Sequence, residues 1–188
     1  MAQILKMKTI LIFVSTLDGK ITKWGDPMIR SWSSQDDQDY FDAIWNDTRI
    51  IIMGSGTFRP DPVKPDSKHL FLVLTKHPDK FKSYEVPGQL EFTNESPLHL
   101  IERIKEGLEK KILIVGGAQI ATAFLREQLI DELWLTFEPK IFGMGAGIVI
   151  SEKLDIKLNL ISCDRVNEIG TLMTKYKVLR NEREMNIK

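Results

Sequence analysis

The stretch Ile112-Leu113-Ile114-Val115-Gly116-Gly117-Ala118 decides the fold of this chain. Its first four residues are apolar and mostly β-branched, which is typical of a short strand buried at the centre of a sheet. Two glycines follow at once and allow a sharp turn, after which residues up to about 128 are expected to form a helix. A second branched strand, Ile50-Ile51-Ile52-Met53, likewise runs into glycines at Gly54-Ser55-Gly56-Thr57. Repeated units of this kind predict an α/β domain with a mainly parallel sheet.

Further elements are expected on either side of these two units. Short apolar or branched runs predict four more strands, at residues 9–14, 70–74, 90–92 and 133–137. The spacing of apolar residues predicts a helix at 35–46. A second helix is expected after Ser96-Pro97, and its buried stripe consists of Leu100, Ile101, Ile104 and Leu108. Near the end of the chain, residues 157–163 and 170–179 have the half-polar pattern and the spacing of an antiparallel hairpin.

Together these elements predict one three-layer α/β domain. Its central sheet is mostly parallel, with helices on both faces and antiparallel C-terminal strands at one edge. The 188 residues of the chain suit a single domain. We expect its core at about residues 8–180 and a frayed, charged tail at 181–188.

Charge and composition exclude several functional classes. Lys plus Arg and Asp plus Glu each number 26, so the net charge is zero and no field is expected that would hold nucleic acid or an anionic membrane. The apolar runs are far shorter than the roughly 20 residues of a membrane span, and the N-terminus lacks the pattern of a secretory signal. The single cysteine, Cys163, is predicted to be inert packing in a strand, and His69, His77 and His99 lack the spacing of metal ligands. The sequence therefore predicts a cytoplasmic protein without a metal.

The two glycine turns are candidate anion sites. In an open α/β sheet, ligands bind beyond the carboxyl ends of the strands, where backbone N–H groups and helix N-termini point outward. Two such turns would suit a molecule with a pyrophosphate, although each glycine pair would also serve simply to turn a tight corner. Thr75 and Lys76 end another strand at the same edge and would suit a further phosphate, or remain a solvated pair.

Asp37 is the carboxylate of most interest. On the expected helix it shares a face with Phe41, Ile44 and Trp45, so it should point toward the interior or a cleft, where burial raises its pKa and suits it to proton transfer. The alternative is structural, because Ser34 and Asp37 have the spacing of a capping box, in which Asp37 would fold back onto the helix N-terminus.

With these segments in place, residues 9–179 resemble the dihydrofolate-reductase-like superfamily. Within it the similarity is greatest to the reductase domain of riboflavin biosynthesis, which occurs alone or as the C-terminal domain of a bifunctional deaminase/reductase. The segments that carry the resemblance are Ser15-Thr16-Leu17-Asp18-Gly19-Lys20-Ile21, Ile52-Met53-Gly54-Ser55-Gly56-Thr57-Phe58, Ile114-Val115-Gly116-Gly117-Ala118, and Leu129-Ile130-Asp131-Glu132-Leu133 leading to Pro139 and Gly143-Met144-Gly145. The deaminase half is missing, because its zinc motif needs a cysteine pair. The resemblance therefore implies a stand-alone reductase domain.

The resemblance implies NADPH as cofactor, bound along the carboxyl edge of the sheet. The residues implied in cofactor binding are Gly54, Ser55, Thr57, Thr75, Lys76, Gly116, Gly117, Ala118 and Gln119. A substrate is implied beside the nicotinamide, near Thr16, Asp18, Trp32 and Thr136, with Asp37 as the catalytic proton source. A homodimer is also implied.

The substrate stays open between two kinds of heterocycle. The first hypothesis is hydride transfer from NADPH to a 5-amino-6-(5-phosphoribosylamino)uracil-like or related compound. The second is a dihydrofolate or pteridine reductase, in which Asp37 and Thr136 would bind the pterin; a third is a nucleotide-binding protein without catalysis. The chain departs from both enzyme patterns. Ser55 and Ala121 stand where folate reductases usually carry an arginine and an aromatic residue, and Val115 stands where riboflavin reductases commonly have glutamate.

Overall fold

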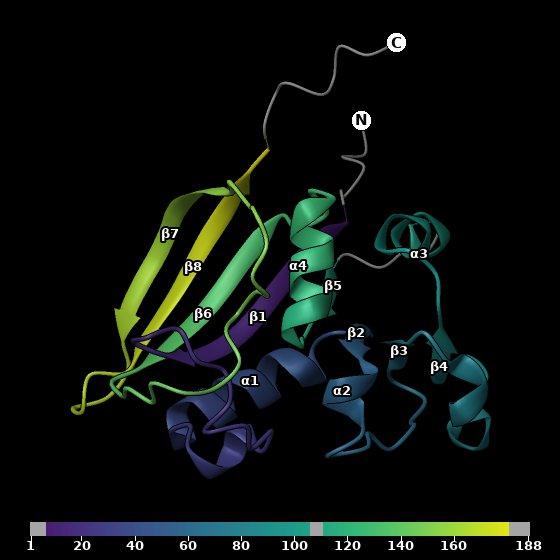
Figure 1. Cartoon of the computed structure of the whole chain (residues 1–188), viewed down its shortest axis with the longest axis horizontal. Coiled ribbons are helices and arrows are strands. Elements are labelled where there is room, and N and C mark those ends of the chain that lie inside the picture. Colours follow the sequence, from purple (N-terminus) through teal and green to yellow (C-terminus); the bar gives the residue numbers. More distant parts are fainter. Residues whose placement is uncertain (1–6, 106–110, 181–188) are drawn as a thin grey trace.

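The computed structural model describes residues 7–105 and 111–180 and places eight strands in one twisted sheet (Figure 1). The strand order is β4-β3-β2-β5-β1-β6-β8-β7. The strands are β1 (Lys8–Thr16), β2 (Ile50–Gly54), β3 (Leu70–Leu74), β4 (Leu90–Thr93), β5 (Lys111–Ile114), β6 (Glu132–Glu138), β7 (Lys157–Arg165) and β8 (Leu172–Leu179). The first six strands in this order are parallel, and β8 pairs antiparallel with both β6 and β7.

Helices cover both faces of the sheet. The α-helices are α1 (Gln35–Asn46), α2 (Ser55–Phe58), α3 (Pro97–Ile104) and α4 (Ala118–Arg126), and the 3₁₀ segments are η1 (Ile29–Ser31) and η2 (Pro78–Tyr84). Because successive strand residues point to opposite faces, the branched strands supply two cores. One core packs under α3 and α4, and the other packs under α1, α2 and η2. The expected three-layer, dihydrofolate-reductase-like fold is thus confirmed.

The carboxyl ends of β2 and β5 lie side by side at the middle of the sheet. The Gly54 N–H donates to the Gly116 carbonyl at 2.8 Å, and the Val115 N–H donates to the Ile52 carbonyl at 3.0 Å. The two glycine turns, 62 residues apart in the chain, are therefore neighbours in space.

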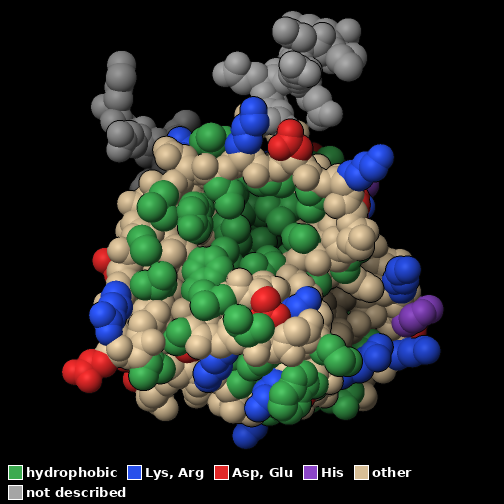
Figure 2. All heavy atoms as spheres, turned by 60° about the vertical axis from the view of Figure 1, so that its left-hand side comes forward, with side chains coloured by type: hydrophobic (Ala, Val, Ile, Leu, Met, Phe, Trp, Pro, Cys, Tyr) green, Lys and Arg blue, Asp and Glu red, His purple; other side chains and the backbone are tan. Residues whose placement is uncertain are grey.

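The antiparallel end of the sheet exposes apolar side chains. Leu158 and Leu160 of β7 pair with Val178 and Tyr176 of β8, which pack on the core that α4 covers. Leu158 and Leu160 are nevertheless 39% and 53% exposed. Figure 2, which brings the β7 end of the sheet forward, shows apolar side chains gathered in a hollow.

A few expectations about local structure need correction. Cys163 was expected to be packed, but it is exposed, because β7 is an edge strand and no helix in the described part of the chain covers that end. The turn at 54–57 contains a single turn of helix, α2, and the loop between β1 and α1 contains η1. Leu108 and the tail at 181–188 lie outside the described residues.

Candidate active site

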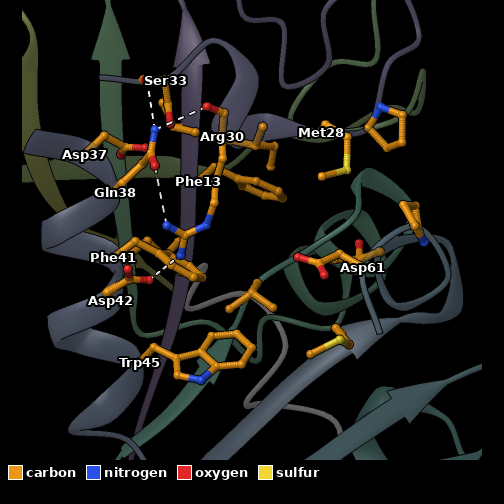
Figure 3. Close-up of a pocket in the computed structure, with 18 of the residues that line it drawn as sticks. Phe13, Met28, Arg30, Ser33, Asp37, Gln38, Phe41, Asp42, Trp45 and Asp61 are labelled. Carbon is orange, nitrogen blue, oxygen red and sulfur yellow. Dashed lines mark hydrogen bonds and ion pairs between the residues drawn. The ribbon is translucent and has the colours of Figure 1, made fainter. Parts of the chain in front are cut away.

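A cavity of about 320 Å³ opens between α1, η1, the end of β1 and the loop that follows α2 (Figure 3). Its wall is mainly apolar, with a few charged groups. The lining residues are Ile12, Phe13, Val14, Pro27, Met28, Ile29, Arg30, Ser33, Asp37, Gln38, Phe41, Asp42, Trp45, Met53, Thr57, Pro60, Asp61, Pro62, Val63 and Val115. Thr57 and Val115 belong to the two glycine turns, so the cavity reaches the carboxyl edge of β2 and β5.

Helix α1 presents Asp37 to this cavity. Ser34 caps the helix, since its hydroxyl accepts a hydrogen bond from the Asp37 N–H at 3.3 Å. The return half of a capping box does not form, because the Ser34 N–H donates instead to Glu138 Oε1 at 2.7 Å. The expected alternative, in which the Asp37 side chain caps the helix, is therefore wrong, and the carboxyl is left for the pocket.

The environment of Asp37 favours its protonated form. The residue is only 6% exposed, and burial raises the pKa of its carboxyl from 3.8 to about 6. A hydrogen bond with Thr136 lowers the pKa, while the nearby Glu138 raises it further. A carboxyl that titrates near neutral pH can hold a proton for a reaction and release it.

Glu138, at the end of β6, is a residue that the sequence reasoning missed. Its side chain is fully buried and accepts hydrogen bonds from the Ser34 N–H and, at 3.0 Å, from the Thr171 hydroxyl. It therefore fixes the start of α1, and with it Asp37, to strand β6. The available signal was a lone acidic residue at the end of the strand sequence Glu132-Leu133-Trp134-Leu135-Thr136-Phe137-Glu138.

Arg30 is the cationic residue among those that line the cavity. Its guanidinium forms an ion pair with Asp42 and donates to Gln38 Oε1 at 3.4 Å (Figure 3). The bond with Asp42 raises the pKa of Arg30, and Asp61 and Asp37 act in the same direction.

At some positions of the glycine turns, internal packing leaves no room for any residue but glycine, and at others it does leave room. A Cβ at Gly54 would lie 2.8 Å from the Ile120 side chain, and one at Gly116 would lie 2.7 Å from the Phe13 ring. At Gly117 the nearest neighbour would be the Thr57 hydroxyl at an ordinary 3.5 Å, and at Gly56 nothing lies within 4 Å. Gly54 and Gly116 therefore turn tight corners, whereas Gly117 borders a cradle that a side chain would fill.

The remaining residues of the expected cofactor site lie along the same edge. Ala118 and Gln119 begin α4, and in the described part of the chain no side chain caps the helix at Gly117. Ser55 begins α2. Thr75 and Lys76 directly follow β3, where the Thr75 hydroxyl accepts from the His77 N–H at 3.3 Å and Lys76 is exposed. These residues and the glycines lie at the ends of β3, β2 and β5, where the first N–H groups of α4 have no acceptor within the helix and could bind an anion.

The expected substrate residues divide into two groups. Thr136 lies against Asp37. Thr16 and Asp18 lie outside the cavity wall, where the Thr16 hydroxyl bonds Asp18 at 2.5 Å and Asp18 accepts from the Phe142 and Gly143 N–H groups. These two residues join the loop after β1 to the loop after β6.

Trp32, the last of the expected substrate residues, is buried beside the loop that follows β6. The residue is 4% exposed and packs edge-on against Phe142, with ring centroids 5.1 Å apart. Its indole N–H has no acceptor in the described part of the chain. Because buried donors without partners are rare, this N–H marks a place for an acceptor on a ligand or on a water.

The described residues were also compared with the patterns of metal sites and membrane spans. Within residues 7–105 and 111–180, no group of His, Cys, Asp and Glu side chains is arranged to hold a metal ion. No helix in the same residues has the length and apolar character to span a bilayer.

The fold and the arrangement of the cavity define an α/β domain of the dihydrofolate-reductase-like class. The model of the RibD C-terminal domain family matches residues 7–171, and the chain belongs to that family. An uncharacterized protein of Bacillus subtilis, YwjB, is 27% identical over 162 residues, which are 83% of this chain and 90% of that protein.

Solved structures share the fold at low sequence identity. A pyrimidine reductase-like protein from Corynebacterium diphtheriae superimposes with a TM-score of 0.78 at 17% identity, covering 93% of each chain. A dihydrofolate reductase from Enterococcus faecalis, solved in complex with NADP(H), has a TM-score of 0.65 at 18% identity, covering 91% of this chain and 96% of the other.

Proposed function

We propose that this protein is an NADPH-dependent reductase that transfers a hydride to a planar heterocycle held in the α1 cavity. One observation carries the proposal: a largely buried carboxyl and an open glycine cradle meet in the same cavity, whose wall includes both Asp37 and Thr57. The family membership and the complex of the dihydrofolate reductase with NADP(H) support the choice of cofactor.

The row of backbone groups at the carboxyl edge would hold the cofactor. Gly117, Ala118 and Gln119 offer the N-terminus of α4 to a pyrophosphate, with Gly54, Ser55, Thr57 and Gly116 beside it and Thr75 and Lys76 for a phosphate on the ribose. NADPH supplies a hydride when it is bound. The protein needs to orient the acceptor, exclude water and provide a proton.

Asp37 is proposed as the source of that proton. Its carboxyl is protonated below about pH 6, and Thr136 and Glu138 fix its position. The apolar wall, which includes Phe13, Phe41 and Trp45, would cover the faces of the substrate ring and keep water away.

Two substrate classes remain under this proposal. A ribosylaminopyrimidine is supported by the family, and a pteridine is supported by the pairing of Asp37 with Thr136. Binding of NADPH without turnover of either class would instead favour the nucleotide-binding protein.

The proposal is tested by titrating the protein with NADPH, following cofactor fluorescence, and by measuring NADPH oxidation with aminouracil and pteridine substrates. We expect binding and turnover in the wild type and at least a tenfold loss of NADPH affinity in Gly117→Asp, because the new carboxylate lies where a phosphate is expected. The matched control is Asn159→Asp on the exposed edge strand β7, which adds the same charge away from the cradle. Circular dichroism checks that both variants fold; unchanged NADPH affinity in a folded Gly117→Asp variant would contradict the proposed cradle.

We also propose that the protein is a cytoplasmic homodimer. The single cysteine, which excludes an intramolecular disulfide, is typical of a reducing compartment and supports the location. The exposed Leu158 and Leu160 of edge strand β7 support self-association, as does the hollow with apolar side chains on this side of the molecule in Figure 2.

A further inference from the structure

We propose that the turn between β7 and β8, residues 166–171, holds the proton source of the cavity in place, with Thr171 and Asn167 as its two positioning residues. This inference rests on the proposed function, which assigns the proton to Asp37. The turn is remote from that residue in the chain, since Asn167 and Asp36 are 131 residues apart. None of the residues of the turn lines the cavity, so neither positioning residue is expected to touch the substrate.

The first contact between the turn and α1 runs through buried groups. The Thr171 hydroxyl donates to Glu138 Oε2 at 3.0 Å, and both residues are fully buried. The other carboxylate oxygen of Glu138 accepts from the Ser34 N–H at 2.7 Å. Ser34 in turn caps α1, because its hydroxyl accepts from the Asp37 N–H at 3.3 Å. A series of hydrogen bonds therefore leads from Thr171 to the backbone of Asp37.

Burial makes this first contact costly to lose. A buried carboxylate is tolerated only where hydrogen-bond donors satisfy its oxygens. Among the described residues, Ser34 and Thr171 each donate to one oxygen of Glu138. Without the Thr171 hydroxyl, Glu138 Oε2 would stay in the interior without this donor, so we expect the carboxylate to rotate toward water and to release the Ser34 N–H. The start of α1 would then lose this link to β6.

The second contact lies at the surface of the molecule. Asn167 Nδ2 donates to Asp36 Oδ2, in the first turn of α1, at 2.8 Å. The carbonyl oxygen of the same amide accepts from the Gly170 and Thr171 N–H groups, both at 3.0 Å. An asparagine suits this place, because an amide both donates and accepts, whereas an ionised carboxylate only accepts. One side chain therefore shapes the turn that carries Thr171 and also joins that turn to α1.

The two contacts meet α1 at Ser34 and Asp36, just before Asp37, which lies at the cavity wall (Figure 3). Burial raises the pKa of the Asp37 carboxyl to about 6, and the charge on Glu138 acts in the same direction, whereas Arg30 acts against it. If the start of α1 moved away from β6, water would reach this carboxyl, and its pKa would fall toward 3.8. The pKa of Asp37 therefore reports on the two contacts.

The test compares two substitutions of Thr171 in the protein without cofactor or substrate. Thr171→Val removes the hydroxyl and keeps the shape of the side chain, whereas Thr171→Ser keeps the hydroxyl. The pKa of Asp37 is measured from the carbon NMR signal of its carboxyl group as the pH is varied. We expect the pKa to fall by about half a pH unit or more in Thr171→Val and to stay within about 0.2 pH units of the wild type in Thr171→Ser.

Thr174→Val is the matched control. Thr174 is a buried threonine of β8, and its hydroxyl donates to the Leu135 carbonyl at 3.0 Å, a contact that does not involve α1. We expect this variant to lose stability in urea denaturation but to keep the wild-type pKa of Asp37. An unchanged pKa in a folded Thr171→Val variant, or an equal fall in both valine variants, would overturn the inference.

Asn167→Ala tests the surface contact, and it also takes the place of Thr171→Val if that variant does not fold. We expect the pKa of Asp37 to fall and hydrogen exchange in residues 33–38 to become about threefold faster or more, as measured by mass spectrometry. Asn159→Ala, on the exposed edge strand β7, is the control. Wild-type exchange and a wild-type pKa in Asn167→Ala would reject a positioning role for Asn167.

The proposed reductase activity is judged by separate measurements, namely NADPH titration and NADPH oxidation. We expect Thr171→Val to lower kcat about tenfold and to leave the affinity for NADPH within about twofold of the wild type, because the substitution lies away from the glycine cradle. A wild type that binds and oxidises NADPH, together with an unmoved pKa in Thr171→Val, would reject the inference alone. A pKa that falls as expected in a protein that does not bind NADPH would reject the reductase and support the contacts between the turn and α1.

Discussion

Burial of the Asp37 carboxyl, which suits it to the proposed proton transfer, also lowers the stability of the folded protein at neutral pH. Burial raises its pKa from 3.8 to about 6, so the folded protein binds this proton more tightly than the unfolded chain does. Asp37 therefore contributes most to the stability of the folded state below pH 4, and this contribution is lost as the pH rises from about 4 to 6. At about 1.4 kcal/mol per pH unit, the loss amounts to roughly 2–3 kcal/mol.

We therefore predict opposite effects of Asp37→Asn on stability and on catalysis. Above pH 6 the variant should be about 2–3 kcal/mol more stable than the wild type, and this difference should vanish near pH 4. Its turnover should fall about 100-fold or more, because the proton donor is lost. Urea denaturation at pH 4 and pH 7.5, together with the rate of NADPH oxidation, checks both effects. Equal stability of the wild type and Asp37→Asn at pH 7.5 would show that burial does not destabilise the ionised Asp37 carboxyl.

The sequence predicted some of these residues and missed others. Asp37 could be found because its position depends on helical spacing within one element. Glu138 could not, because its partner Ser34 is 104 residues away and its role depends on how α1 meets β6. The sequence also could not predict which glycine is required by packing. Gly116 and Gly117 differ because the Phe13 ring lies against the Cα of Gly116, where it leaves no room for a Cβ, and does not lie against Gly117.

At the scale of elements, the start of α1 depends on one buried side chain. The substitution Glu138→Ala would leave the Ser34 N–H and the Thr171 hydroxyl without their acceptor. We expect it to lower the free energy of unfolding by about 1–3 kcal/mol. Glu138→Gln keeps an acceptor for Ser34 but removes the negative charge that raises the pKa of Asp37.

Glu138→Gln is therefore predicted to fold and to lower the pKa of Asp37 below about 6. The pH at which turnover falls should move down with it, while the melting temperature changes less than in Glu138→Ala. The control is Glu152→Ala, whose partner Arg126 is half exposed, so that its loss should cost under about 1 kcal/mol. A pH profile that does not move in Glu138→Gln would limit Glu138 to a structural role.

The regular elements were more predictable than the short ones. The predicted boundaries at 35–46 and 70–74 agree with α1 and β3, because a helix of 12 residues shows a clear period and β3 is a continuous apolar run with polar residues on both sides. The segments η1, η2 and α2 had no such period. A single turn is too short to show one, and its conformation depends on packing partners such as Phe81 with Phe92 and Phe58.

At the scale of the whole molecule, the sheet has one protected end and one exposed end. The β4 end is covered by η2 and α3, whereas β7 leaves apolar side chains exposed on the side of the molecule that Figure 2 brings forward. Placing charge there should prevent self-association.

We predict that Leu160→Lys is a monomer while the wild type is a dimer. Light scattering coupled to size-exclusion chromatography measures the mass of each, with Ile141→Lys, at an exposed position outside the strands, as the control. A wild-type protein that stays monomeric at high concentration would reject the proposed dimer.

The buried carboxyl on α1 has a practical consequence for engineering this protein. A mutant library screened for heat resistance alone, near neutral pH, should become enriched in clones that have exchanged Asp37 for asparagine or an apolar side chain. The selected variants would be folded and heat-resistant but would lack the proposed reductase activity. Screens for hardier versions therefore need a turnover step in every round.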